Sequence, residues 1–130
     1  MMLTQKDYWI KEAWESLKTS QVLIKNGRYL EGAFFCHLTI EKILKAKFSN
    51  LTDQVPPKIH DLRRLSEISG VSNQLNEEQI EFLATLSTFQ LEGRYPRFRE
   101  KILQSVSSRE FKNILKETGD FLRWCIKQIQ

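Results

Sequence analysis

The sequence predicts an all-α protein: an up-and-down, antiparallel bundle of four to five helices forming a single domain over residues 1–130. Three observations predict this class. Only five glycines and three prolines occur in 130 residues, and they cluster at a few points with long uninterrupted stretches between them. Within these stretches apolar residues recur at steps of three and four, which is the helical period. The chain is 41% hydrophobic, which is enough apolar surface to cover a core.

The first helix is expected from Thr4 to Lys25, and Asn26-Gly27 ends it. Thr4 and Asp7 are spaced as in a capping box with a shorter acid, a pattern typical of helix N-termini. Steps of four and three then place one apolar face along the helix, at Ile10, Trp14, Leu17, Gln21 and Ile24.

The second helix is expected from Tyr29 to Ser49, and its apolar pattern predicts that it is the central element of the bundle. The connection after it, residues 50–59, contains Pro56-Pro57, which cannot continue a helix. This connection is longer than an up-and-down bundle needs, so it is a crossover, a flap or part of a contact surface.

The second half of the chain predicts a short helix over residues 60–69 that stops at Gly70. The next helix begins after Asn76, whose side chain is a favoured N-cap, and ends near Gly93. One or two helical turns are expected over residues 97–106. The last helix then begins at Ser107 or Ser108 and continues to the C-terminus.

Several classes of site are excluded by what the sequence lacks. It holds two histidines and two cysteines, but no Cys-x-x-Cys pair, no His-Glu-x-x-His motif and no Glu-x-x-His pair. Glycine-rich phosphate loops and closely spaced aspartates are also missing. We therefore expect no metal, no cofactor and no catalytic residues of these kinds. Cys36 and Cys125 are expected to be buried thiols.

The charged residues are spread so that no apolar stretch approaches the length of about 20 residues that a membrane span requires. The N-terminal residues also lack the apolar segment of a secretory signal. We therefore expect no membrane association and a cytoplasmic protein.

A polar pair lies on the second helix, where His37 and Glu41 are one helical turn apart beside the apolar stripe. The structural interpretation is a satisfied polar pair at a helix or dimer seam, because buried polar groups usually pair for structural reasons. The functional interpretation is a pair that contacts a ligand or transfers protons.

A cationic segment follows the fourth predicted helix, with four cations and two aromatic residues over residues 94–101. Arginine side chains suit phosphate groups, and an aromatic ring between them can stack on a base. The alternative is a solvated helix junction whose cations pair with neighbouring acids. The candidate binding residues are Arg94, Tyr95, Arg97, Arg99 and Lys101, with Lys45 from the second helix.

Charge is segregated along this part of the chain. Residues 76–93 carry four glutamates and no lysine or arginine, a net charge of −4, whereas residues 94–106 carry +3. Adjoining patches of opposite sign suit a two-fold interface between copies. They also suit neutralisation within one chain.

The motifs together resemble the HEPN domain family. The second helix ends with Glu-Lys-x-Leu-Lys-Ala over residues 41–46, which looks like the second-helix signature of these domains. His60-Asp61-Leu62 with Leu65 resembles the His-x-Leu-x-x-Leu opening of the next helix, and Arg94-Tyr95-Pro96 resembles the Arg-Tyr-Pro that follows the fourth helix. The turn Asn26-Gly27-Arg28-Tyr29 also matches.

The resemblance implies a helical bundle that forms a homodimer and acts with a minimal nucleotidyltransferase encoded nearby, as a nucleotide- or partner-binding subunit and in some cases as part of a toxin-antitoxin pair. It also implies an alternative, because many HEPN proteins bind RNA or are metal-independent ribonucleases with the signature Arg, four to six residues, then His. Neither His37 nor His60 follows an arginine at that spacing. We therefore expect a non-catalytic subunit first, an RNA-binding or divergent ribonuclease protein second, and a plain dimeric scaffold third.

Overall fold

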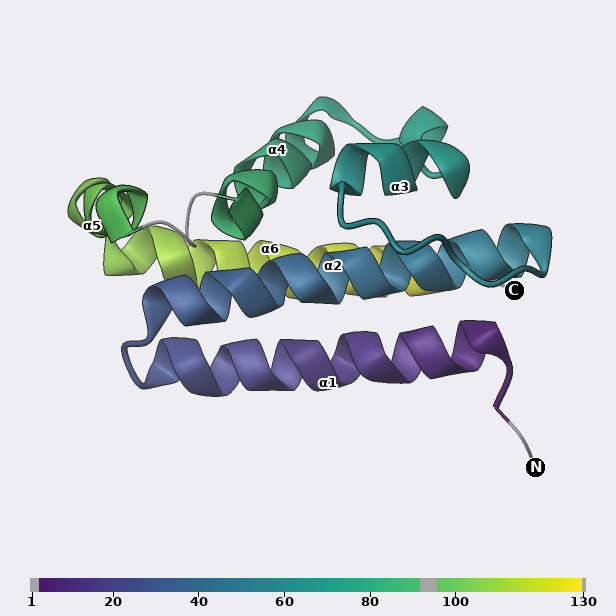
Figure 1. The fold of residues 1–130 in the computed structure, drawn as a ribbon, viewed down its shortest axis with the longest axis horizontal. Helices are drawn as coiled ribbons and strands as arrows, with labels where there is room; N and C mark the ends of the chain where they lie inside the picture. Colours follow the sequence, from purple (N-terminus) through teal and green to yellow (C-terminus); the bar gives the residue numbers. More distant parts are fainter. Residues whose placement is uncertain (1–2, 92–95, 130) are drawn as a thin grey trace.

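The structure, a computed structural model, describes residues 3–91 and 96–129, except for the side chains of residues 91 and 96–98. The described residues form α-helices and one short 3₁₀ helix, with no β-strand among them (Figure 1). The prediction of an all-α fold is therefore confirmed. The elements are α1 (Gln5–Lys25), α2 (Tyr29–Thr52), α3 (Leu62–Ile68), η1 (Ser72–Gln74), α4 (Glu77–Leu91), α5 (Pro96–Ser105) and α6 (Ser108–Lys127).

Helix α2 is the centre of the bundle, as its apolar pattern predicts. It packs against α1, α3, α4 and α6. Helices α1 and α2 form an antiparallel hairpin, while α3 and α4 cover another side of α2 (Figure 1). Helix α5 is seen nearly end-on at the left of the view, so it runs across the long helices rather than along them (Figure 1).

The ends of α1 follow from local chemistry. The Thr4 hydroxyl accepts a hydrogen bond from the Asp7 backbone N–H at 3.1 Å, which satisfies one of the free donors of the first turn. At the other end Gly27 has a φ of 78°, a conformation that favours glycine, and it turns the chain into α2. Both predicted boundaries of this helix agree with the structure to within one residue.

Helix α2 is longer than predicted, because it continues three residues past Ser49 to Thr52. Its C-cap is Asp53, which adopts a left-handed conformation with φ 58° and donates its backbone N–H to the Ser49 carbonyl at 2.8 Å. The Ser49 hydroxyl also donates to the Gln54 carbonyl at 2.8 Å. These bonds extend the helix and shorten the connection that the sequence placed at residues 50–59.

The predicted start of α3 at His60 was wrong by two residues. Asp61 is the N-cap, since its carboxylate accepts hydrogen bonds from the backbone N–H groups of Arg63 and Arg64 at 3.0 and 3.3 Å. The helix therefore begins at Leu62. His60 lies before the cap, outside any helix, and its ring contacts another helix.

The later helices follow their caps. Asn76 and Gln79 exchange side chain to backbone hydrogen bonds at 2.8 and 3.0 Å at the start of α4. Ser107 accepts from the Glu110 backbone N–H at 3.1 Å at the start of α6. The predicted end of α4 near Gly93 lies outside the described residues. The sequence did not predict η1, and it placed only one or two turns where α5 has ten residues.

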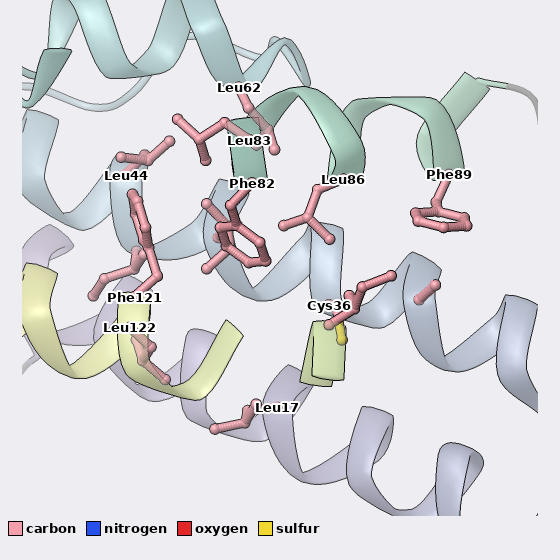
Figure 2. Packing of buried hydrophobic residues seen from close by; sticks show 14 of the residues in the cluster. Leu17, Cys36, Leu44, Leu62, Phe82, Leu83, Leu86, Phe89, Phe121 and Leu122 are labelled. Carbon is pink, nitrogen blue, oxygen red and sulfur yellow. The ribbon is translucent and has the colours of Figure 1, made fainter. Parts of the chain in front are cut away.

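The core is one cluster of apolar side chains between the helices. Figure 2 shows Phe82, Leu86 and Phe89 pointing from α4 toward α2 and α6. Both cysteines are free and buried, as predicted. Among the described helices, none combines the length and the apolar character needed to cross a bilayer.

Candidate functional site

The residues predicted from the cationic segment are described only in part. Arg94 and Tyr95 lie outside the described residues, as does the side chain of Arg97. Arg99 and Lys101 lie on α5 with exposed side chains. The structure therefore tests the position of two cations of this segment.

Arg99 is part of a contact that joins α5 to α2. Its Nη2 donates to Oε1 of Glu31 at 2.8 Å. The other carboxylate oxygen of Glu31, Oε2, accepts from Nε of Arg28 at 3.2 Å. One carboxylate thus receives two guanidinium groups, one from the α1–α2 turn and one from α5.

The charge state of Glu31 follows from this environment. Burial raises the pKa of its carboxyl, but the hydrogen bond and the charge of Arg99, together with the hydrogen bond from Arg28, outweigh burial and lower the pKa below its ordinary value. Glu31 is therefore ionised at neutral pH. Its side chain is 29% exposed, whereas that of Arg99 is 45% exposed.

The local structure explains why these three groups meet. Gly27 turns the chain so that Arg28 becomes the N-cap of α2, and Glu31 then falls in the first helical turn. A carboxylate is favoured there by the helix dipole. On α5, Ile102 is 9% exposed and packs into the core, which places Arg99 one turn earlier beside α2. Sequence reasoning missed Arg28 and Glu31 as site residues, although their i,i+3 spacing was visible.

A second polar cluster lies further along α2, where Lys45 contacts Glu41. The Lys45 ammonium donates to Oε2 of Glu41 at 3.1 Å, and both residues are buried, with 5% and 4% exposure. The ammonium also lies 5.3 Å from the centroid of the Trp9 ring on α1. A charge buried this deeply requires such partners, because an unpaired buried ion is costly.

Two histidines approach the same carboxylate. Nδ1 of His60 lies 3.0 Å from Oε2 of Glu41, and the His60 side chain is 58% exposed. Nδ1 of His37 lies 3.7 Å from Oε1, which is beyond hydrogen-bonding distance. The predicted pair of His37 and Glu41 therefore lies within a larger cluster. The sequence analysis did not predict that His60 and Lys45 also contact the Glu41 carboxylate.

The two clusters are separate. Lys45 follows Glu31 by fourteen residues on the same helix, which places the two about 21 Å apart along the axis. Lys45 therefore does not converge with Arg99, although the sequence grouped them. Within the described ranges, no group of three or more His, Cys, Asp or Glu side chains is arranged to hold a metal ion.

Comparison with known proteins places these features in a family. A family model described as the HEPN domain matches residues 7–129, nearly the whole chain. The chain belongs to the HEPN domain family. No curated protein and no solved structure matches it. Two motifs of the HEPN resemblance also touch in the structure, because the helix with Glu41 and the segment with His60 meet at 3.0 Å. HEPN membership favours an RNA-binding or nuclease-like function.

Proposed function

We propose that this chain is a non-catalytic HEPN subunit that binds a nucleotide or a protein partner and acts with a separately encoded minimal nucleotidyltransferase, in a pair of the toxin-antitoxin kind. The binding residues are those of the cationic segment: Arg94, Tyr95, Arg97, Arg99 and Lys101. The observation that carries the proposal is the placement of Arg99 and Lys101, which are exposed on α5 where α5 crosses the end of the bundle (Figure 1). Phosphate groups are preferred ligands of exposed arginine side chains.

The sequence supports a subunit without catalysis of its own. Neither histidine follows an arginine with four to six residues between them, which is the spacing of HEPN ribonucleases. Closely spaced aspartates of the kind that bind metal ions in nucleotidyl transfer are missing from the chain. A partner chain would supply those carboxylates.

Nucleotide binding is tested by titrating ATP and GTP into the purified protein and measuring heat and melting temperature. We expect a rise in melting temperature that is lost in Lys101→Gln. The matched control is Lys18→Gln, which makes the same change in charge at an exposed lysine on α1 instead of α5. Unchanged melting temperatures at all nucleotide concentrations would remove this half of the proposal.

The partner is tested by co-expressing the chain with the product of the adjacent open reading frame. We expect the two to co-purify, and the mass of the chain alone, measured by light scattering, to be that of a homodimer. Slow growth on expression of either product alone, relieved by the other, supports the toxin-antitoxin role. Failure to co-purify and growth unaffected by either product would exclude the pair.

One observation favours a second candidate function, a metal-independent ribonuclease. The exposed ring of His60 is held at Nδ1 by the buried Glu41 carboxylate, an arrangement that fixes the tautomer and leaves Nε2 as a proton acceptor. Nε2 would take the proton of a ribose 2′-hydroxyl as the 2′-oxygen attacks the adjacent phosphorus. The P–O5′ bond then breaks, and the leaving 5′-oxygen takes a proton from water, giving a 2′,3′-cyclic phosphate.

This second function is tested by incubating the protein with RNA in the presence of a chelator. Cleavage that yields 2′,3′-cyclic ends and disappears in His60→Gln would establish it, and His37→Gln is the control on the same carboxylate. Intact RNA after prolonged incubation would exclude it and leave the binding function.

A further inference from the structure

We propose that Arg28 and Arg99 form an anion site, that Glu31 is its internal occupant, and that a phosphate group of the ligand binds by displacing the Glu31 carboxylate. This inference rests on the proposed function and names the regulation of that site. It adds Arg28, which lies 71 positions before Arg99 in the chain, to the binding residues.

The geometry is that of an occupied anion site. Two guanidinium groups from separate elements approach the two oxygens of one carboxylate, at 2.8 and 3.2 Å. A phosphate group presents oxygen atoms that accept the same N–H donors, and arginine binds carboxylate and phosphate with the same fork of donors. Exchange of one anion for the other therefore keeps both arginines hydrogen-bonded.

The start of α2 adds further donors to this site. Arg28 is the N-cap of the helix, and its side chain makes no capping hydrogen bond to the first turn. The backbone N–H of Glu31 already donates to the Glu31 carboxylate, whereas the other N–H groups of the first turn have no partner within the helix. Together with the dipole of a long helix, they favour a negative charge at this end. An anion placed between Arg28 and Arg99 would lie at the helix terminus that attracts it.

The occupant can leave. The side chains of Arg28, Arg99 and Glu31 are 65%, 45% and 29% exposed, so a ligand reaches all three from solvent. An exposed ion pair contributes only about 0 to 1 kcal/mol, which a ligand that brings more than one negative charge can outcompete. Glu31 lies in the first turn of α2, where a change of side-chain rotamer moves the carboxylate into water without unfolding the helix.

Two roles of Glu31 predict opposite changes in ligand affinity when its charge is removed. If Glu31 holds Arg99 in the position that the ligand needs, removing its charge weakens binding. If Glu31 competes with the ligand, removing its charge strengthens binding. The sign of the change in affinity therefore separates the two roles.

The experiment measures the affinity of the full chain for ATP and for a twelve-nucleotide single-stranded RNA by calorimetry or fluorescence anisotropy, at fixed salt. The variants are Glu31→Gln, Arg28→Gln and Arg99→Gln, each checked by circular dichroism and melting temperature. We expect Glu31→Gln to tighten binding by up to about fivefold, the loss of a competing exposed pair. Either arginine variant weakens binding by a similar factor.

The chain offers a matched control. Glu67 on α3 also receives two arginines, with Nε of Arg63 at 3.5 Å from Oε1 and Nη1 of Arg64 at 3.8 Å from Oε2. Glu67→Gln therefore makes the same change in net charge and also frees two arginines, but away from α5. A general electrostatic effect would tighten binding equally in both variants.

The outcomes separate the inference from the proposed function. Tighter binding in Glu31→Gln, with Glu67→Gln unchanged, supports the inference, and the probe that responds identifies the phosphate as that of a nucleotide or of RNA. Unchanged or weaker binding in Glu31→Gln, or equal tightening in Glu67→Gln, overturns the inference while the proposed function stands. If neither the parent chain nor Glu31→Gln binds either probe, nucleotide binding fails as well.

Discussion

Nδ1 of His60 lies 3.0 Å from Oε2 of Glu41, and this contact joins the connection before α3 to the middle of α2. The same oxygen accepts the Lys45 ammonium at 3.1 Å. The other oxygen, Oε1, is buried and accepts no hydrogen bond within the described part of the chain. Glu41 is therefore the point at which the connection, α2 and the Trp9 region of α1 are held together.

The contribution of this contact is tested by His60→Ala. The substitution removes one of the two groups on Oε2 and leaves Lys45, so we expect a loss of about 1.5 kcal/mol in the free energy of unfolding. This is the lower end of the range for hydrogen bonds to a charged group, because the His60 side chain is 58% exposed. Urea unfolding at pH 7 measures it. Arg63→Ala is the control, because that side chain is 91% exposed and its loss is expected to change stability by less than about 0.5 kcal/mol. Equal effects in the two variants would show that His60 does not hold the connection.

The pairing of Glu31 with Arg99 predicts a pH dependence. The pKa of Glu31 is lowered in the folded protein, so its contribution is fully present above the pKa of the unfolded chain and is lost as the pH falls through the folded value. Because Arg99 is 45% exposed, solvent screening limits this contribution to about 0.5 to 1 kcal/mol.

The measurement compares urea unfolding of the parent chain and Arg99→Gln at pH 7, 5 and 3. The difference in stability should be present at pH 7 and should become smaller at pH 3, as protonation of Glu31 removes the charge that Arg99 contacts. Added salt at pH 7 should reduce it as well. A difference that is constant with pH would mean that Arg99 stabilises α5 by packing rather than by charge.

The two cysteines are expected to be unreactive in the folded protein. Burial raises the pKa of the Cys36 thiol, an effect that hydrogen bonds with Thr118 and Ser20 only partly offset, and burial raises that of Cys125 strongly. Because the thiolate is the nucleophile, both thiols should react with a disulfide reagent at pH 8 only after the chain is unfolded in urea. Gln104→Cys places a thiol on the exposed side of α5 and is the positive control. Rapid labelling of the parent chain would contradict the burial of Cys36 or Cys125.

The fold was predictable because its information is local. Thr4 and Asn76 cap helices whose apolar faces repeat at steps of three and four, and each cap is where the pattern predicts it. Ser107 caps α6, whose start the sequence placed at Ser107 or Ser108. Two helix boundaries were predicted wrongly, the end of α2 and the start of α3, and each lies at an aspartate. Asp53 extends α2 by adopting a left-handed conformation, and Asp61 delays α3 by capping it.

The site was predictable only in part because its contacts are not local. Glu41 and Lys45 are one turn apart, yet their position in the protein interior depends on Trp9 and on packing that a helical pattern does not reveal. Glu31 and Arg99 are separated by 68 residues, so nothing in the spacing of either motif predicts that they meet. The sequence identifies the cations of a site of this kind, but only the fold shows which carboxylate pairs with them.

The turn that carries Arg28 depends on a close approach between α1 and α2. A Cβ atom built on Gly32 would overlap Cγ1 of Ile24, a core side chain that is only 2% exposed. Gly32→Ala should therefore lower the free energy of unfolding by about 1 to 3 kcal/mol, the cost of overpacking a core, despite the better helix propensity of alanine.

Gly119 on α6 is the matched comparison, because it is also a buried helical glycine. The atoms nearest to a Cβ there would be those of the Arg123 guanidinium, 3.1 Å away at the end of a flexible side chain that is 56% exposed. Gly119→Ala should therefore raise stability by up to about 1 kcal/mol, because alanine loses less backbone entropy in a helix. Thermal and urea unfolding of both variants measure the two effects. If Gly32→Ala were also stabilising, Ile24 would not pack tightly against α2, and the first turn of α2 would not be fixed where Glu31 meets Arg99.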